Sequence, residues 1–444
     1  MNALAIAFVL IAAIGLIALP RRWAALALLA GGVHLPVDLS LALGPFNFYA
    51  MRLLLAIGVL RVMMRGEAQT YHINGLDTMM LVWSAAALAT SLLHEDVVAT
   101  LVNRSGMVYT CALTYFLFRV FCQSRDEALD LCRITAWVLM PLAVAIAYEK
   151  RTGLNPFAVF GGSTLLSEIR DQTVRAQGPF AHSILCGFVG ATTLPLMAAL
   201  WKPHRKTAIA GAVAALTLVL ASGSSGPFLG AIYATGALLF WHWRQHLRLL
   251  RWLVVLAYVA LDIVMKAPAY YLLARIDLTG SSTSWHRAAL IEAAIDHLPQ
   301  WWLAGTNHTR SWLPYGVAWS DQHADITNHY IRMGVDGGLP LMLSFIAVLV
   351  LAFATVGRSL RQAETPGAAP PFLIWALGAA LFTHATAFLG VSYFDQSVVF
   401  LYMTLAAIGS LAPQAARQHV NSVRPLRIRT APTAAHAPTR SVLR

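Results

Sequence analysis

Long apolar runs follow one another along almost the whole chain, and only two long polar stretches interrupt them. We count 13 runs, each suited to a helix whose surface is apolar on every side. The second run is weak, because His34, Pro36 and Asp38 interrupt it. The pattern therefore predicts 12–13 transmembrane helices. The runs begin near Met1, Trp23, Phe46, Leu76, Val97, Ala128, Ser183, Thr207, Gly226, Trp252, Gly337, Pro371 and Tyr393.

The composition favours the same fold class. Hydrophobic residues make up 58% of the chain and charged residues 12%, and the mean hydropathy is +0.62. Soluble domains carry about a quarter charged residues, so neither a soluble globular protein nor a disordered chain fits. We expect an all-α polytopic membrane protein with a helical extracytoplasmic loop domain.

The distribution of Lys and Arg predicts the orientation. The first run ends in Arg21 and Arg22, the reverse of the charge order in a cleaved signal peptide. We therefore expect a retained helix with its N-terminus outside. Alternating from there, 20 of the 32 Lys and Arg residues fall in inner loops or the tail. Nine fall in or beside the two long outer segments, where the positive-inside rule does not apply.

This topology divides the chain into six parts. They are N-terminal transmembrane helices (1–148), an outer loop (149–181), central transmembrane helices (182–265), a large outer loop (266–336), C-terminal transmembrane helices (337–412) and a disordered cytoplasmic tail (413–444). The tail has six Arg and no acidic residue. In a membrane protein such an excess, and the net charge of +12, indicate anionic membrane lipids as partners and not nucleic acid.

The large outer loop contains most of the polar chemistry. Apolar side chains recur at helical spacing over 290–298, which predicts an amphipathic helix that ends before Pro299. Arg275 and Arg287 precede this helix. Five Trp side chains offer faces for sugar rings or anchors at the headgroup level. They are Trp285, Trp301, Trp302, Trp312 and Trp319.

The end of this loop predicts a polar helix face at the mouth of a membrane helix. If the helix begins near Ile326, steps of three and four residues bring together acids, an amide, an imidazole and a guanidinium. The residues are Asp325 or Thr327 as the cap, Asn328, His329, Arg332 and Asp336. Such a group suits proton transfer and anion stabilisation. The alternative is an interfacial cap whose charges are solvated or bind lipid phosphate.

Three Arg residues lie within or near apolar runs: Arg52, Arg104 and Arg133. Arg among apolar residues is costly and usually faces a cavity or a partner. The topology places Arg52 and Arg104 in the outer parts of their helices, as candidates for function or for structural pairing. Arg133 lies nearer the inner end, where its side chain can snorkel to water.

Several common sites are not indicated. The chain has no DxD motif, no Walker-type loop and no GxGxxG loop. Its four Cys residues show no CxxC spacing, so neither a zinc site nor a disulfide framework is expected. We therefore expect no metal and no cofactor.

Four motifs resemble those of the O-antigen ligase and polysaccharide polymerase superfamily. They are the stretch from Asp277 through Ser284, Arg287, Pro299 and Gly305; DITNHYIRMGVDGGLP (325–340); RAQGPFAHS (175–183); and SGSSGPFLG (222–230). Two departures are present. The family His before the Asn is Thr327 here, with a His at position 329, and Gly223 to Ser225 replace the Arg of the family's "S-R-G" turn.

The resemblance implies a metal-independent glycosyltransferase at the outer face of the bacterial inner membrane, with periplasmic long loops. The donor is a polyprenyl-diphosphate-linked glycan, and the acceptor is another glycan for a polymerase or lipid A–core for a ligase. We expect His329, Asn328 and Arg287 to be catalytic. The expected substrate-binding residues are Arg175, Arg275, Arg332, Arg52, Arg104, Asp325 and Tyr330.

Two other functions remain open. A transporter or flippase for lipid-linked glycans predicts ionisable groups near the bilayer midplane and repeat-related halves. Asp262, Lys266 and His384 are the candidates for such groups, and no repeat is visible. A non-catalytic membrane protein of an envelope-assembly complex predicts that Arg287 and His329 are dispensable.

Overall fold

A computed structural model describes residues 1–43, 46–272, 284–315, 317–318, 320–363 and 372–411. Arg275, Trp319 and the basic tail lie outside these residues. Over the described part the chain is mostly helical, which confirms the all-α prediction. Residues 1–412 group into one compact unit.

Thirteen of the described helices coincide with the 13 predicted apolar runs. They are α1 (Ala3–Ala18), α2 (Arg21–Val33), α3 (Ala50–Arg65), α4 (Gly75–Ser91), α5 (Val97–Phe121), α6 (Arg125–Thr152), α7 (Ser183–Ala199), α8 (Arg205–Ala221), α9 (Ser225–Leu239), α10 (Leu247–Val264), α14 (His329–Ala363), α15 (Phe372–Ala387) and α16 (Ser397–Ser410). Two further helices, α12 (Ser284–Asp296) and α13 (Leu298–Trp301), lie in the large loop.

Two of the described helices, α6 and α14, are long and apolar enough to cross a membrane by length and composition. Four other apolar helices, α1, α7, α15 and α16, have 10–17 residues. A helix of 17 residues rises about 26 Å, less than the hydrocarbon thickness of about 30 Å. The count of 12–13 membrane-crossing helices therefore stays a prediction.

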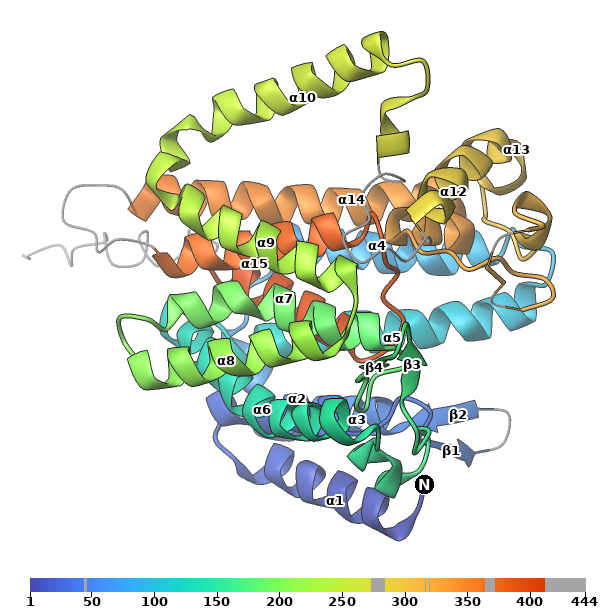
Figure 1. The fold of residues 1–444 in the computed structure, drawn as a ribbon. Coiled ribbons are helices and arrows are strands. Elements are labelled where there is room, and N and C mark those ends of the chain that lie inside the picture. The colour runs from blue at the N-terminus through green and yellow to red at the C-terminus, as the bar shows by residue number, and fades with distance from the viewer. Residues whose placement is uncertain (44–45, 273–283, 316, 319, 364–371, 412–444) are drawn as a thin grey trace, which may run out of the picture. The chain divides into compact units, whose positions relative to one another are not determined.

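Two antiparallel hairpins interrupt the helices. In one, β1 (Ser40–Leu43) pairs with β2 (Phe46–Tyr49); in the other, β3 (Glu168–Arg170) pairs with β4 (Thr173–Arg175). The run predicted to be helical from Phe46 therefore begins as a strand. Both hairpins and α12–α13 lie at the same end of the helices (Figure 1). We call this the hairpin end.

Small residues allow the central helices to pack closely. A Cβ added to Gly190 of α7 would lie 2.3 Å from the carbonyl oxygen of Ala215 in α8. A Cβ on Gly211 of α8 would lie 2.2 Å from the Sδ of Met197 in α7. Close backbone approach of this kind is typical of helix pairs in membranes.

Hydrogen bonds between distant segments join the loops at the hairpin end to one another. Asn2 Nδ2 donates to the Val159 carbonyl at 2.7 Å. Gln396 Nε2 donates to the carbonyls of Leu35 at 2.6 Å and Pro179 at 2.9 Å. The N-terminus, the β3–β4 segment and the loop before α16 are therefore held together.

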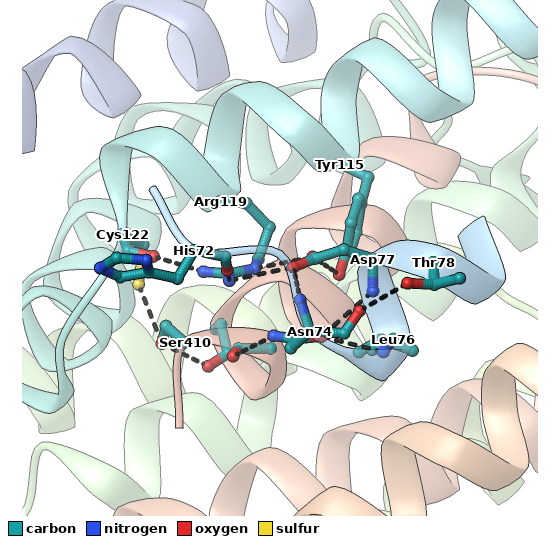
Figure 2. A network of polar contacts seen from close by, with 11 residues as sticks. His72, Asn74, Leu76, Asp77, Thr78, Tyr115, Arg119, Cys122 and Ser410 are labelled. Carbon is teal, nitrogen blue, oxygen red and sulfur yellow. Dashed lines mark hydrogen bonds and ion pairs between the residues drawn. The ribbon is translucent and has the colours of Figure 1, made fainter. Parts of the chain in front are cut away.

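A buried ion pair joins the helices at the opposite end (Figure 2). The fully buried Asp77 carboxylate accepts hydrogen bonds from Arg119 Nε at 3.0 Å and Tyr115 Oη at 2.5 Å. Asn74 caps α4 and donates through Nδ2 to the Gly409 carbonyl at 3.0 Å. The network therefore connects α4, α5 and α16. Arg119 is one of the 20 Lys and Arg residues that the predicted topology assigns to inner loops or the tail, but it lies in α5 and is buried.

Replacing Asp77 by Asn should lower the free energy of unfolding by about 3–5 kcal/mol, because Arg119 would then be a buried charge without a counter-ion. The double variant Asp77→Asn/Arg119→Leu should recover much of that loss. Thermal unfolding in detergent measures both effects. The control is Asp130→Asn, which removes a partly exposed ion pair with Arg133 and should cost about 0–1 kcal/mol. A double variant as unstable as Asp77→Asn alone would contradict the ion-pair interpretation.

Candidate functional site

Helix α14 is broken at the hairpin end. Gly337 (φ −160°, ψ 29°) and Gly338 (φ 69°, ψ −172°) leave the helical conformation. The loop satisfies backbone groups that the break frees. Thr306 N–H donates to the Val335 carbonyl at 2.9 Å, and Leu339 N–H donates to the Trp302 carbonyl at 2.7 Å. The turn after α13 therefore docks into the break.

Glycines on both partners make this docking fit. Gly305 has φ +86°, and a Cβ there would lie 2.1 Å from the Val335 carbonyl oxygen. A Cβ on Gly338 would lie 2.4 Å from the Leu303 carbonyl oxygen. The turn near Gly305 and the glycine-rich start of α14 were separate motifs in the sequence, and they form one structural unit.

A carboxylate next to the break is shared by two guanidinium groups. Asp336 Oδ1 lies 3.0 Å from Arg104 Nη1, and Asp336 Oδ2 lies 3.0 Å from Arg332 Nε. The Asp336 and Arg104 side chains are 8% and 7% exposed, whereas the Arg332 side chain is 42% exposed. We call these three residues the triad. Its formal charge is +1, and Arg104 Nε has no hydrogen-bond partner among the described residues.

Histidines surround the triad. His94, in the turn between α4 and α5, is buried; its pKa is lowered by burial and by Arg104. His323, half-buried in the large loop, has its pKa lowered by burial and by Arg332. His308 Nε2 lies 3.3 Å from Glu95 Oε2, which joins the large loop to the α4–α5 turn.

The helix containing His329 begins later than predicted. It begins at His329, not near Ile326, and its cap is Asn328 rather than Asp325 or Thr327. Asn328 Oδ1 accepts from the N–H groups of Tyr330 at 3.0 Å and Ile331 at 3.1 Å. The cause is local: an Asn amide before two free N–H groups is a strong cap. Within the predicted helix face, Arg332 and Asp336, four residues apart, are the two residues that form an ion pair with each other.

The His329 ring is enclosed by aromatic side chains. It lies 4.7 Å from the Phe388 ring and 5.1 Å from the Phe345 ring, between centroids. Its Nδ1 accepts the Tyr393 N–H at 3.3 Å. These are the surroundings of a structural residue, and the catalytic role of His329 stays a prediction. Tyr330 has a structural contact as well, because its hydroxyl donates to the Ala385 carbonyl at 2.9 Å.

Other predicted site residues lie at the same end. Arg287, in α12, lies against the loop before α16: a Cβ on Gly390 would be 3.3 Å from Arg287 Nε. The residue before it, His286, is buried and bonds through Nε2 to the Asp325 carbonyl at 2.9 Å. Burial raises the pKa of the Asp325 carboxyl.

Arg52 and Arg175 have partners of their own. Arg52 Nε donates to Thr110 Oγ1 of α5 at 3.3 Å. Arg175, at the end of β4, is buried and pairs with Glu168 Oε1 at 3.1 Å. The predicted residues therefore form more than one group: the triad with its histidines, Arg287 at Gly390, and Arg175 beside the hairpin.

The loop 388–396 between α15 and α16 was missed from the sequence, and it links these groups. Its Phe388 carbonyl accepts the His329 N–H at 2.9 Å, next to the triad helix. Its Asp395 Oδ2 accepts the Ala181 N–H at 2.9 Å, in the segment that follows Arg175. The sequence feature that could have revealed this loop is the polar pair Asp395 and Gln396 within an apolar run.

The large loop has a small core of its own. Leu290, Ala294, Trp301 and Trp312 are buried in it. The amphipathic helix predicted over 290–298 is therefore present, but Ile295 is 58% exposed. Two of the five Trp residues thus pack inside the loop, while Trp285 and Trp302 are about half exposed and remain available to a ligand or an interface.

Comparison of the chain with protein-family models, with curated proteins and with solved structures finds no match.

Substituting Gly338 by Ala should destabilise the protein strongly and release the turn near Gly305, because the new Cβ would overlap the Leu303 carbonyl and φ is +69°. We expect a loss of about 2–4 kcal/mol, measured by thermal unfolding, with faster proteolysis of the large loop. Gly236→Ala is the matched control, because nothing lies within 4 Å of its Cβ position. It should be neutral or slightly stabilising. Equal behaviour of the two variants would contradict the docking described here.

Proposed function

We propose that this chain is a metal-independent membrane glycosyltransferase of the O-antigen ligase and polysaccharide polymerase type. Its donor is a polyprenyl-diphosphate-linked glycan, and its acceptor is a glycan or lipid A–core. The observation that carries the proposal is the triad, in which two guanidinium groups share one buried carboxylate. One positive charge is left over, and Arg332 is exposed enough to meet a substrate.

A diphosphate is the anion that best fits this arrangement. Arg binds phosphate oxygens in pairs through its planar fork, and its charge does not depend on pH in the physiological range. Asp336 holds Arg332 through Nε, so the two terminal nitrogens can point to a ligand. Arg287 adds a further guanidinium from α12 at the same end of the helices.

The reaction needs a base as well as cations. The acceptor hydroxyl attacks the anomeric carbon, the bond from that carbon to the phosphate oxygen breaks, and its electron pair leaves with the diphosphate. The hydroxyl proton passes to the base. His323 is suited to this role, because burial and the charge of Arg332 lower its pKa and keep it neutral near pH 7. The arginines stabilise the charge that develops on the leaving group.

We also propose that the helices cross the bacterial inner membrane, with the hairpin end in the periplasm and the tail in the cytoplasm. Two observations support this. Long-range polar contacts join loops or helix ends that lie at the same end of the helices, as for Gln396 with Pro179 and for Asn74 with Gly409. In addition, none of the 18 residues of α10 is buried, although most are apolar, and lipid would cover such a helix.

Arg332→Ala should lower glycan transfer about 100-fold, because an interaction with developing charge on the diphosphate is lost. The assay uses purified protein in lipid vesicles, a polyprenyl-diphosphate-linked oligosaccharide and a glycan or lipid A–core acceptor. Arg361→Ala, near the far end of the same helix, is the control and should keep wild-type turnover. Wild-type turnover in Arg332→Ala would argue against the triad as the site.

The same assay distinguishes the two candidate bases. Loss of turnover in His323→Ala with retention in His329→Ala assigns the role to His323. No turnover by wild-type protein with any acceptor, together with movement of the lipid-linked glycan across the vesicle membrane, would favour the flippase alternative. Neither activity would favour an assembly protein.

The orientation can be tested by cysteine labelling in intact cells. Tyr315→Cys, at a side chain that is 97% exposed in the large loop, should react with a thiol reagent that does not cross membranes. Trp243→Cys, 57% exposed between α9 and α10, should react only after the cells are permeabilised. The four native Cys residues are buried and should give little background. Labelling in the opposite order would refute the proposed orientation.

A further inference from the structure

Helix α10 lies apart from the other helices, at the outside of the bundle (Figure 1). Its first turns contain two arginines and a tryptophan, Arg248, Arg251 and Trp252, and all three side chains are exposed. Steps of three and four residues place them on one face of the helix. We call these three residues the arginine face.

The arginine face has no acid to neutralise it. Arg248 and Arg251 form no ion pair with any residue that the structure describes. Arg251 Nε donates to the Leu247 carbonyl of its own helix at 3.4 Å, and no described residue accepts from its terminal nitrogens. The one acid of α10, Asp262, lies about three turns further along and accepts the Ala269 N–H at 2.9 Å.

This lack of a counter-ion distinguishes the arginine face from other arginines of the helices away from the hairpin end. Those arginines have carboxylate partners: Arg21 with Glu127, Arg61 with Glu67, Arg119 with Asp77, and Arg133 with Asp130. Two positive charges are therefore left uncompensated on the surface of α10.

The segment before α10 is fixed to the bundle, although α10 itself buries none of its residues. In η3 (Phe240–His246), the Trp241 ring contacts Phe372 and Trp375 of α15, at 5.5 and 5.7 Å between centroids. The guanidinium carbon of Arg244 lies 4.2 Å from the centroid of the Trp241 ring. The arginine face therefore follows directly from an anchored segment.

Apolar residues continue the helix beyond the arginine face. Residues 252–261 carry no charge, and ten helical residues rise about 15 Å, which is half of a hydrocarbon thickness of about 30 Å. On the side of the arginine face lie Val255 and Val259, which are 52% and 47% exposed. Cations, then a tryptophan, then apolar side chains match the order of phosphate, interface and acyl chain in one leaflet.

A lipid satisfies this surface better than another protein does. A second copy of the chain, related by a twofold axis along the membrane normal, would bring the same arginines against each other. An acidic protein segment would pair with the arginines but would leave the apolar residues beyond them uncovered. A phospholipid supplies both a phosphate and acyl chains.

We propose that the arginine face binds the phosphate of an anionic phospholipid, whose acyl chains lie along Val255 and Val259. Arg is suited to phosphate, because its planar fork can donate two hydrogen bonds to the phosphate oxygens. The lipid lies in the leaflet at the end of the helices opposite the hairpin end. The site rests on the proposed crossing of the membrane and not on the proposed glycosyl transfer.

The test titrates phosphatidylglycerol, and in parallel phosphatidylcholine, into the detergent-solubilised full-length protein. Native mass spectrometry counts the lipids bound per protein. The wild type should prefer phosphatidylglycerol. The double variant Arg248→Gln/Arg251→Gln should bind it about 25-fold more weakly, at about 5-fold for each arginine. Because both side chains are exposed, this variant should fold as the wild type does.

The matched control is Arg358→Gln/Arg361→Gln, which removes two exposed arginines with the same spacing near the end of α14. It should bind phosphatidylglycerol as the wild type does. Every variant keeps the basic tail, so attraction of the tail to anionic lipid is the same in each. Arg248→Lys/Arg251→Lys keeps the charge and should restore most of the binding that the Gln variant loses.

The outcomes separate the lipid site from the proposed membrane crossing. Release of the protein from membranes by a carbonate wash would refute the crossing, and the lipid site with it. If the protein stays in the membrane, an equal loss in the two Gln variants would show a general effect of net charge and would overturn the site. Equal binding of both lipids by the wild type would overturn it as well.

Discussion

The carboxylate of Asp336 lies between two guanidinium groups beside a break in a helix, and the hairpin end is organised around this contact. Removing a carboxylate from water costs several kcal/mol of desolvation free energy, and attraction to a single counter-ion seldom offsets that cost. Two arginines do so here, Arg332 from α14 itself and Arg104 from α5, and the Arg104 contact joins α5 to α14. The break that follows at Gly337 and Gly338 gives the loop its docking place. The large loop therefore docks directly beside this ion contact.

The buried charged groups at the two ends of the helix assembly differ in how completely they are hydrogen-bonded. At the end shown in Figure 2, Asp77 and Arg119 are bonded to each other and to neighbouring polar groups, so their charges hold α4 and α5 together. At the hairpin end, Arg104 Nε and Arg175 Nε have no partner among the described residues. A buried donor without an acceptor is costly and calls for a ligand or water. The incompletely satisfied guanidinium groups at the hairpin end therefore support the choice of that end for the proposed site.

The sequence predicted the positions of the helices well, because a long apolar run has few alternatives to helix and its ends are marked by charge. It predicted the site less well. Arg119 looked like a loop cation, since nothing in its own segment reveals Asp77, 42 residues earlier in the chain. The start of α14 was placed three residues too early, because Asp325, Thr327 and Asn328 are all good caps and only tertiary contacts choose among them. Loop 388–396 was overlooked because its polar pair lies within an apolar pattern.

The choice of Asn328 as the cap also decides where the histidines point. With the helix beginning at His329, that ring enters the aromatic cluster of Phe345, Phe388 and Tyr393 and becomes part of the packing between α14 and the loop 388–396. For the proposed reaction we therefore favour His323 of the large loop over His329 as the base. The same loop docks into the break at Gly338 through backbone hydrogen bonds. A loop held by backbone hydrogen bonds to a broken helix is well suited to keep a half-buried histidine within reach of an incoming hydroxyl.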